Sequence, residues 1–219
     1  FLDLKLPNAT MVPISIDVTG LVLEGMQRFD EWKRIREIIP SSHSIPVAIA
    51  GNYDDVNRLC TEIADKYRWA FVNINLRPFY TEGAKTYGFE VAEQLGWRLP
   101  QHIVVPTAGG TILPKVARAF EEMVTVGLVP DTPWKIYSAQ AAGSAPVVNA
   151  LHRESDLIEP VKPNTIAKSI AIGNPADGYY SLVQLRDTNG GCGNVSDDEI
   201  IQGIKLLAET EGIFAETAG

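Results

Sequence analysis

Cysteine is scarce in this chain: its 219 residues include only Cys60 and Cys192. The two lie far apart, and neither has companions at the spacing of a metal site, so a disulfide framework and a zinc site are not expected. A reducing, cytoplasmic location fits this cysteine usage best. We expect Cys60 to be a buried thiol on the apolar face of a helix. Cys192 stands in a Gly-Gly-Cys-Gly segment, for which we expect a flexible exposed loop.

Runs of positive charge and long apolar runs are missing as well. The formal net charge is −8, and no run of Lys or Arg offsets it, so nucleic acid and anionic membranes are not expected partners. No apolar stretch approaches the length of a membrane span, and the first residues lack a signal-peptide pattern. With 45% hydrophobic and 21% charged residues, the composition is typical of a soluble α/β protein.

Short apolar runs alternate with segments of helical periodicity from about Val47 onward. The predicted strands cover residues 47–50, 69–75, 102–107, 134–140 and 170–172. The predicted helices cover residues 54–67, 82–95 and 146–152, a segment through 116–123, a segment starting near 176, and a segment from 196 to 212. This order predicts an α/β fold with a mainly parallel, twisted sheet and helices on both faces.

Several helix ends are also predicted. Thr81 is the expected N-cap of the helix over 82–95, and Gly96 its end. Ser196 and Glu199 form the pattern of a capping box, which opens a helix that Gly212 closes. Asn174 is a candidate cap for the helix that begins near Ala176.

Residues 1–46 differ from the rest and are expected to form a segment separate from a domain over 47–219. They contain an apolar run at Ile14–Val18, an amphipathic stretch at Phe29–Ile39, and a linker rich in proline and serine. If the sheet has an open edge, the run at Ile14–Val18 is the expected strand to cover it.

A glycine-rich segment, Thr107-Ala108-Gly109-Gly110-Thr111, lies between a predicted strand and a predicted helix. Glycines lack Cβ atoms, so successive backbone N–H groups can converge on one anion, and a helix N-terminus favours negative charge there. The threonine hydroxyl groups add donors. The pattern favours a phosphate site; the alternative is a tight turn without a ligand, since no lysine follows at the Walker spacing.

A second glycine segment, Ile172-Gly173-Asn174, follows the apolar run at 170–172 and permits a close approach of the backbone to a ligand. Arg77 on a loop could bind a phosphate bidentately, and Lys85 could stabilise an anion at the start of a helix. Ordinary solvated positions are the alternative for both. His43, His102 and His152 show no spacing of a metal or nucleophile site, so no metal is expected.

Taken together, these segments resemble threonine synthase, of the fold-type-II pyridoxal phosphate (PLP) enzymes. The resemblance covers residues 47–219, and several long segments carry it in order. They are GNYDDVNRLC (51–60), FVNINLRPFYTEGAKTYGFEVAEQLGW (71–97), HIVVPTAGGTILPK (102–115), SAQAAGSAPVVNAL (138–151), NTIAKSIAIGNPADG (164–178) and SDDEIIQGIKLLAETEGIFAETAG (196–219).

The resemblance implies a fold like that of the tryptophan synthase β subunit, with PLP as the cofactor. It implies a carbon–oxygen lyase that converts O-phosphohomoserine and water to threonine and phosphate. Residues 107–111 would hold the cofactor phosphate, and residues 172–174 would line the cofactor ring. Arg77, or else Lys85, would neutralise the substrate phosphate. The expected partner is thus a small phosphorylated amino acid, with a second copy or another chain covering open sheet edges.

The chain departs from the family pattern in its catalytic residues. The lysine that forms the Schiff base with PLP is expected N-terminal to the matched region, and neither Lys5 nor Lys33 has its context. The asparagine expected near the cofactor 3′-oxygen belongs to the same segment. The hydroxyl residue expected to face the pyridine nitrogen belongs to a segment beyond Gly219. The resemblance therefore assigns no catalytic residue, and the matched region is expected to be an incomplete, inactive form of the enzyme.

Three alternatives stay open. The chain could be a non-catalytic module that binds phosphate or PLP, or a subunit whose site a partner completes. It could be a relative of threonine dehydratase or cysteine synthase. A doubly wound nucleotide-binding domain is disfavoured, because the chain lacks a GxGxxG motif with a following acidic residue.

Overall fold

The computed structural model describes residues 51–69, 71 and 77–219. The chain divides into two compact units, Phe1–Arg77 and Pro78–Gly219, and each is described by itself. The predicted strand at 47–50 and all predictions for residues 1–46 lie outside the described residues. Trp69 and Phe71, the two described residues of the strand predicted over 69–75, are not in a strand.

The described part of the first unit is built around helix α2 (Tyr53–Tyr67), as predicted. Asn52 and Asp55 form a capping box at its start. Its apolar face buries Cys60 in a small cluster with Phe71. The prediction of a buried Cys60 is therefore confirmed, and burial raises the pKa of its thiol.

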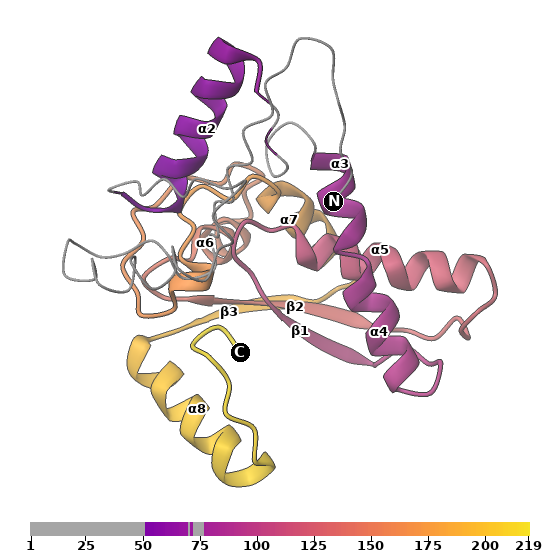
Figure 1. Cartoon of the computed structure of the whole chain (residues 1–219). Coiled ribbons are helices and arrows are strands. Elements are labelled where there is room, and N and C mark those ends of the chain that lie inside the picture. The colour runs from indigo at the N-terminus through magenta and orange to yellow at the C-terminus, as the bar shows by residue number, and fades with distance from the viewer. Residues whose placement is uncertain (1–50, 70, 72–76) are drawn as a thin grey trace, which may run out of the picture. The chain divides into compact units, whose positions relative to one another are not determined.

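The second unit alternates helices and strands (Figure 1). Its elements are α3 (Arg77–Gly83, whose first residue belongs to the first unit), α4 (Thr86–Gln94), β1 (His102–Pro106), α5 (Ile112–Thr125), β2 (Lys135–Ala141), α6 (Pro146–His152), the 3₁₀ helix η2 (Lys168–Ile170), α7 (Gly178–Asp187), β3 (Gly191–Val195) and α8 (Asp197–Glu211). The predicted strands at 102–107 and 134–140 and the helix at 146–152 are confirmed to within one or two residues.

The three described strands form a parallel sheet in the order β1-β2-β3. Val105 aligns with Ser138, and Ser138 aligns with Cys192. Because paired residues in register point to the same face, this row of side chains lies on one side of the sheet. That side faces the core, which α5, α6 and α7 complete. A parallel sheet with flanking helices is thus present.

The prediction of helices on both faces is corrected for the described part of the chain. On the face opposite the core, Val104 stays 64% exposed. Helix α8 projects from the end of β3, as Figure 1 shows, and none of its residues is buried. Only the α5–α6–α7 face is therefore packed among the described residues.

The loop predicted at Cys192 is wrong, because Gly191–Val195 forms strand β3. Glycine-rich strands have little intrinsic preference for β structure, so this one depends on pairing with β2. Cys192 packs against the core, and burial raises the pKa of its thiol.

Three further local predictions are corrected. Residues 170–172 do not form a strand: they end η2 and continue in turns, in which Ile172 N donates to Ile170 O at 2.8 Å. The helix predicted over 82–95 is split into α3 and α4, with Gly83 at the break, and Thr81 lies inside α3 rather than at an N-cap. The N-cap position of α7 is Asp177, not Asn174.

Candidate functional site

The glycine loop, residues 107–111, follows the carboxyl end of β1 and leads directly into α5. Thr107 is buried at its start, where its hydroxyl donates to Val105 O at 3.0 Å and accepts from Ser138 Oγ at 2.9 Å. Its backbone N–H donates to Ala139 O on β2 at 2.8 Å. The first residue of the loop is therefore fixed to the sheet by both backbone and side chain.

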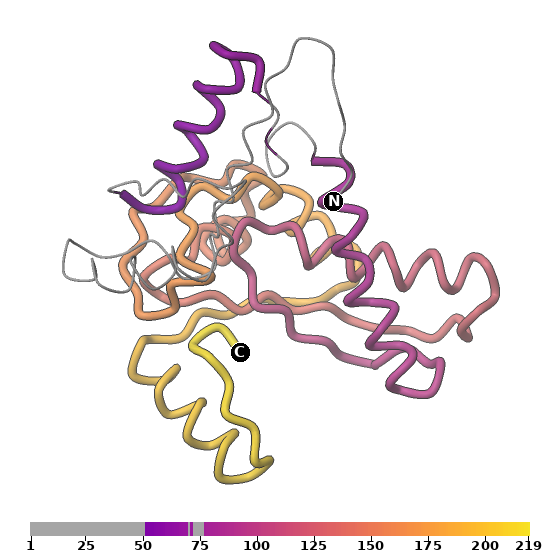
Figure 2. Tube along the Cα trace, viewed as in Figure 1, coloured from indigo at the N-terminus to yellow at the C-terminus, as the bar shows by residue number. Residues whose placement is uncertain are grey.

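The second half of the loop packs on the start of α7. Gly110 has φ +85°, and a Cβ there would lie 2.7 Å from the carbonyl carbon of Asp177, so only glycine fits. Thr111 Oγ1 donates to Asp177 Oδ2 at 2.5 Å, and both residues are buried. In the Cα trace, the chain entering α7 runs beside the loop between β1 and α5 (Figure 2).

The second predicted segment, 172–174, lies next to this loop. A Cβ on Gly109 would be 3.6 Å from Ile172 Cδ1, which is an ordinary contact. Ile172 O accepts a hydrogen bond from Ser144 Oγ at 3.1 Å, and Gly173 O accepts one from Val161 N at 3.0 Å. Asn174 is exposed. The structure thus brings together two segments that are about 60 residues apart in the sequence.

Lys85 lies elsewhere in the second unit, between α3, α4 and α5. Its Nζ is 2.6 Å from Glu82 Oε2 and 3.0 Å from Glu122 Oε2, and the side chain is only 14% exposed. Hydrogen bonding raises the pKa of Lys85 and lowers the pKa of each glutamate. Arg77 is the first residue of α3 and belongs to the first unit, whereas the glycine loop belongs to the second.

The N-terminus of α5 is suited to an anion. Thr111 occupies the N-cap position but makes no capping hydrogen bond, and the first turn contains no acidic residue. The first N–H groups of a helix have no partner within the helix, and they carry its positive dipole end. With no Cβ at Gly109 or Gly110 and an uncapped helix start, the residues present fit a phosphate group.

Sequence reasoning missed three residues that hold the loop: Gln140, Asp177 and Ser181. Gln140 is a polar residue at an inward-facing position of β2, which could have marked it as a buried hydrogen-bonding group. Asp177 and Ser181 are four residues apart at the start of α7, a spacing that puts them on one face. Nothing in the sequence shows that this face meets the glycine loop.

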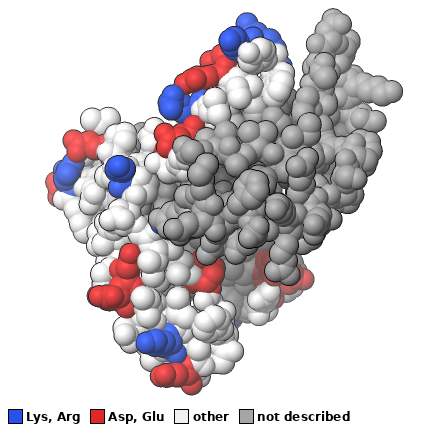
Figure 3. Space-filling model, turned by 60° about the vertical axis from the view of Figure 1, so that its left-hand side comes forward, with Lys and Arg blue, Asp and Glu red and all other residues white. Residues whose placement is uncertain are grey.

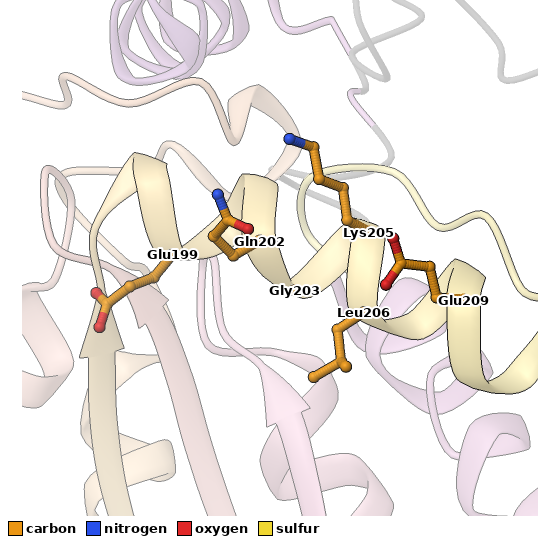
Figure 4. Close-up of a pocket in the computed structure, with 6 residues that line it drawn as sticks. All are labelled: Glu199, Gln202, Gly203, Lys205, Leu206 and Glu209. Carbon is orange, nitrogen blue, oxygen red and sulfur yellow. The ribbon is translucent and has the colours of Figure 1, made fainter.

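Other parts of the described surface show weaker candidates for a functional site. A shallow hollow on α8 is lined by one helix alone (Figure 4), namely by Glu199, Gln202, Gly203, Lys205, Leu206 and Glu209. Basic and acidic side chains are interspersed over the described surface visible in Figure 3. Among residues 51–69, 71 and 77–219, no cluster of His, Cys, Asp and Glu could hold a metal ion. No helix in the same ranges is long and apolar enough to cross a membrane.

A parallel sheet, with a glycine loop at the carboxyl end of a strand and an uncapped helix start after the loop, is an α/β arrangement that suits an anion. The family model "pyridoxal-phosphate dependent enzyme" matches residues 35–219. The chain therefore belongs to the pyridoxal-phosphate dependent enzymes, and its fold is that of fold type II. PLP is the cofactor of this family, and the residues of the glycine loop fit its phosphate.

Similar curated proteins are threonine synthases, as the sequence resemblance indicated. The enzyme of Methanocaldococcus jannaschii is 34% identical over 173 residues, which are 78% of this chain and 42% of that enzyme. The enzyme of Synechocystis is 31% identical over the same shares of the two chains. The enzyme of Mycobacterium tuberculosis is 33% identical over 177 residues and 45% of its length. The chain thus spans less than half the length of the threonine synthases that it matches.

Solved structures agree on the fold. Threonine deaminase isoform 2 of Solanum lycopersicum superposes with a TM-score of 0.60 at 18% identity, over 86% of this chain and 50% of that one. Maize serine racemase superposes with a TM-score of 0.57 at 18% identity, over 87% and 55%. At these identities the likeness concerns the fold alone.

Proposed function

We propose that this chain provides the cofactor-phosphate site of a threonine synthase-like enzyme, which converts O-phosphohomoserine and water to threonine and phosphate. The observation that carries the proposal is the glycine loop at the uncapped start of α5, fixed on both sides by buried hydrogen bonds. The similarity of the chain to threonine synthases, over 78% of its length, favours this reaction over those of other PLP enzymes.

In this proposal, residues 107–111 bind the PLP phosphate through backbone N–H groups, and the α5 dipole adds favourable electrostatics. Ile172 supplies an apolar contact beside Gly109, and residues 172–174 line the cofactor ring. PLP, when bound, supplies an electron sink for the carbanion chemistry of amino-acid substrates. The chain's own residues orient the cofactor by holding its phosphate end.

For the substrate phosphate, the proposal favours Arg77 over Lys85. Lys85 belongs to an ion-pair network in which Glu82 and Glu122 also bind Lys115 and Arg118. An arginine can bind a phosphate bidentately, whereas a lysine acts as a point charge. We further propose that turnover needs a lysine that forms the Schiff base with PLP, a role that the matched segments within residues 47–219 do not assign.

A pair of variants at Gly109 tests the phosphate site. Gly109 is not in the left-handed region, and a Cβ there makes only an ordinary contact, so the backbone accepts a residue with a Cβ. Gly109→Asp places a negative charge in the loop, and Gly109→Asn places a neutral side chain of the same shape. We expect Gly109→Asp to bind PLP at least about tenfold more weakly than Gly109→Asn, by absorbance titration.

Gly193→Asp serves as the control for an added charge, since a Cβ there meets nothing within 4 Å. It should bind PLP as the wild type does. Equal binding by the two Gly109 variants, or no binding by the wild type, would contradict the phosphate site. Borohydride reduction of the PLP complex and peptide mapping then separate the alternatives: a single labelled lysine supports an enzyme, and binding without labelling supports a non-catalytic module or a partner subunit.

A further inference from the structure

Two buried side chains hold carbonyl groups of the glycine loop. Gln140 Nε2 donates to Thr107 O at 3.0 Å, and Ser181 Oγ donates to Gly110 O at 2.9 Å. Gln140 on β2 is 1% exposed, and Ser181 on α7 is fully buried. A hydrogen bond in such an environment is costly to lose, because the abandoned carbonyl has no water to replace its partner.

A third carbonyl, Gly109 O, accepts from the backbone N–H of Asp177 at 2.9 Å. The peptide bonds here are trans, so each N–H points away from the carbonyl of its own peptide unit. The carbonyls face the protein, and the N–H groups of Ala108, Gly110 and Thr111 therefore point away from these anchors. No acceptor for those three N–H groups is found among residues 51–69, 71 and 77–219.

The orientation of the Gln140 amide is fixed by a second set of contacts. Its Oε1 accepts from Val147 N at 3.0 Å and from Val148 N at 3.1 Å, both at the start of α6. Since two donors occupy the oxygen, the nitrogen must face Thr107 O, and the flipped amide is excluded. Gln140 thus links the loop to α6 as well as to β2.

We infer that Gln140 and Ser181 are positioning residues for the cofactor phosphate, each holding one carbonyl of the glycine loop. The N–H groups of the residues that follow, Ala108 and Thr111, are thereby presented to the anion. This inference rests on the proposed phosphate site. It adds to that site two residues that do not touch the ligand, contributed by β2 and α7.

The first test is Gln140→Glu in the full chain, with pyridoxine 5′-phosphate as the probe. This probe has the phosphate of PLP but no aldehyde, so it does not react with lysines. The introduced carboxylate can still accept from the amides of α6, but it cannot donate to Thr107 O and repels it. We expect binding about tenfold weaker than in the wild type at neutral pH.

The pH dependence of this variant separates positioning from general damage. When protonated, the introduced carboxyl regains one O–H donor, which can bond Thr107 O while the other oxygen accepts from α6. The ratio of variant to wild-type affinity should therefore rise toward one as the pH falls. Comparing the two proteins at each pH cancels the titration of the probe's own phosphate.

The second test pairs Ser181→Ala with Ser138→Ala. Both remove a hydroxyl that is buried and donates one hydrogen bond. Ser181 bonds a loop carbonyl, whereas Ser138 bonds the Thr107 hydroxyl, so only the first change frees a peptide of the loop. We expect Ser181→Ala to weaken probe binding several-fold and Ser138→Ala, which leaves the loop carbonyls bonded, to weaken it clearly less, with similar stability losses measured by urea unfolding.

Amide proton shifts of the ¹⁵N-labelled wild type complete the test. Titration with the probe should shift the amide protons of Ala108, Gly110 and Thr111 downfield, as expected for donors to a phosphate. If the wild type binds but these amides do not move, or Gln140→Glu keeps wild-type affinity at every pH, the inference is wrong while the phosphate site stands. No binding by the wild type would overturn both.

Discussion

Helices α5 and α8 have 14 and 15 residues, but they are stabilised in opposite ways. Helix α5 has no side-chain cap at its start, and it buries Leu113, Val116, Ala117, Ala119, Phe120 and Met123. Helix α8 buries no residue, yet it begins with a complete capping box and ends at Gly212 in the left-handed conformation. Tertiary packing holds α5, and local hydrogen bonds hold α8.

The difference between the two N-termini shows that a helix can be stable without a capped start. In α8 the capping box bonds the Glu199 N–H, and three acidic residues of the first turn, Asp197, Asp198 and Glu199, interact favourably with the helix dipole. Helix α5 has neither feature: its N-cap residue makes no capping hydrogen bond, and its first turn contains no acidic residue. A helix that is held by its apolar face can leave its N-terminus open, and that open end is where the glycine loop lies.

The sharpest test of this contrast replaces one glycine near each helix by alanine. In Gly110→Ala the new Cβ meets the backbone of Asp177 at 2.7 Å, and φ is +85°. We expect a loss of about 2 kcal/mol or more in unfolding free energy, together with loss of PLP binding. In Gly203→Ala on α8 the Cβ meets nothing within 4 Å, and we expect a gain of about 0.5–1 kcal/mol.

Urea unfolding followed by circular dichroism measures both changes, and absorbance titration with PLP measures binding. The contrast would be wrong if Gly110→Ala were as stable as the wild type and bound the cofactor. It would also be weakened if Gly203→Ala lost stability, since that would indicate packing of α8 against the rest of the chain.

Sequence patterns predicted the elements whose determinants are local. The capping box at Ser196, the end at Gly212 and the periodicity of α5 all lie within a few residues of the helices they define. Strand β3 was missed because its glycines carry no preference, and its existence depends on a partner strand about 50 residues away. The apolar run at 170–172 predicts a strand but ends η2 instead, because a short apolar run does not distinguish a strand from other structure.

The glycine loop of the candidate site was predictable because its sequence pattern is local. Glycines between a strand and a helix mark a loop that can approach an anion, and this pattern is local. The residues that hold the loop are not local: Gln140 is 33 positions from Thr107, and Ser181 is 71 positions from Gly110. Their role follows from topology, which brings β2 and α7 against the loop only in the folded chain.

A second test compares the two N-cap residues. Ser196→Ala removes a capping bond, so we expect the amide protection of residues 200–203 to fall by about 1 kcal/mol, with PLP binding unchanged. Thr111→Val removes a hydroxyl that makes no capping bond but holds Asp177. It should leave the protection of α5 unchanged and weaken PLP binding. Hydrogen exchange and PLP titration on both variants check this, and the reverse outcome would refute the contrast.

The smallest expected effect is a pH dependence confined to α8. Hydrogen bonds from the Ser196 backbone and hydroxyl lower the pKa of Glu199 below its ordinary value of 4.5. A carboxyl group whose pKa is lower in the folded than in the unfolded state stabilises the folded state at a pH above its unfolded-state pKa. This stabilisation is lost as the pH falls through the folded-state pKa. Amide protection in the first turns of α8 should therefore decrease on acidification from pH 7 to about pH 3.

Glu199→Gln should remove this change, because a glutamine side chain does not titrate. Amides of α5 near Val116, at a helix start without acidic residues, provide the internal reference. An equal loss of protection there would mean that the whole unit, rather than the capping box, responds to acid.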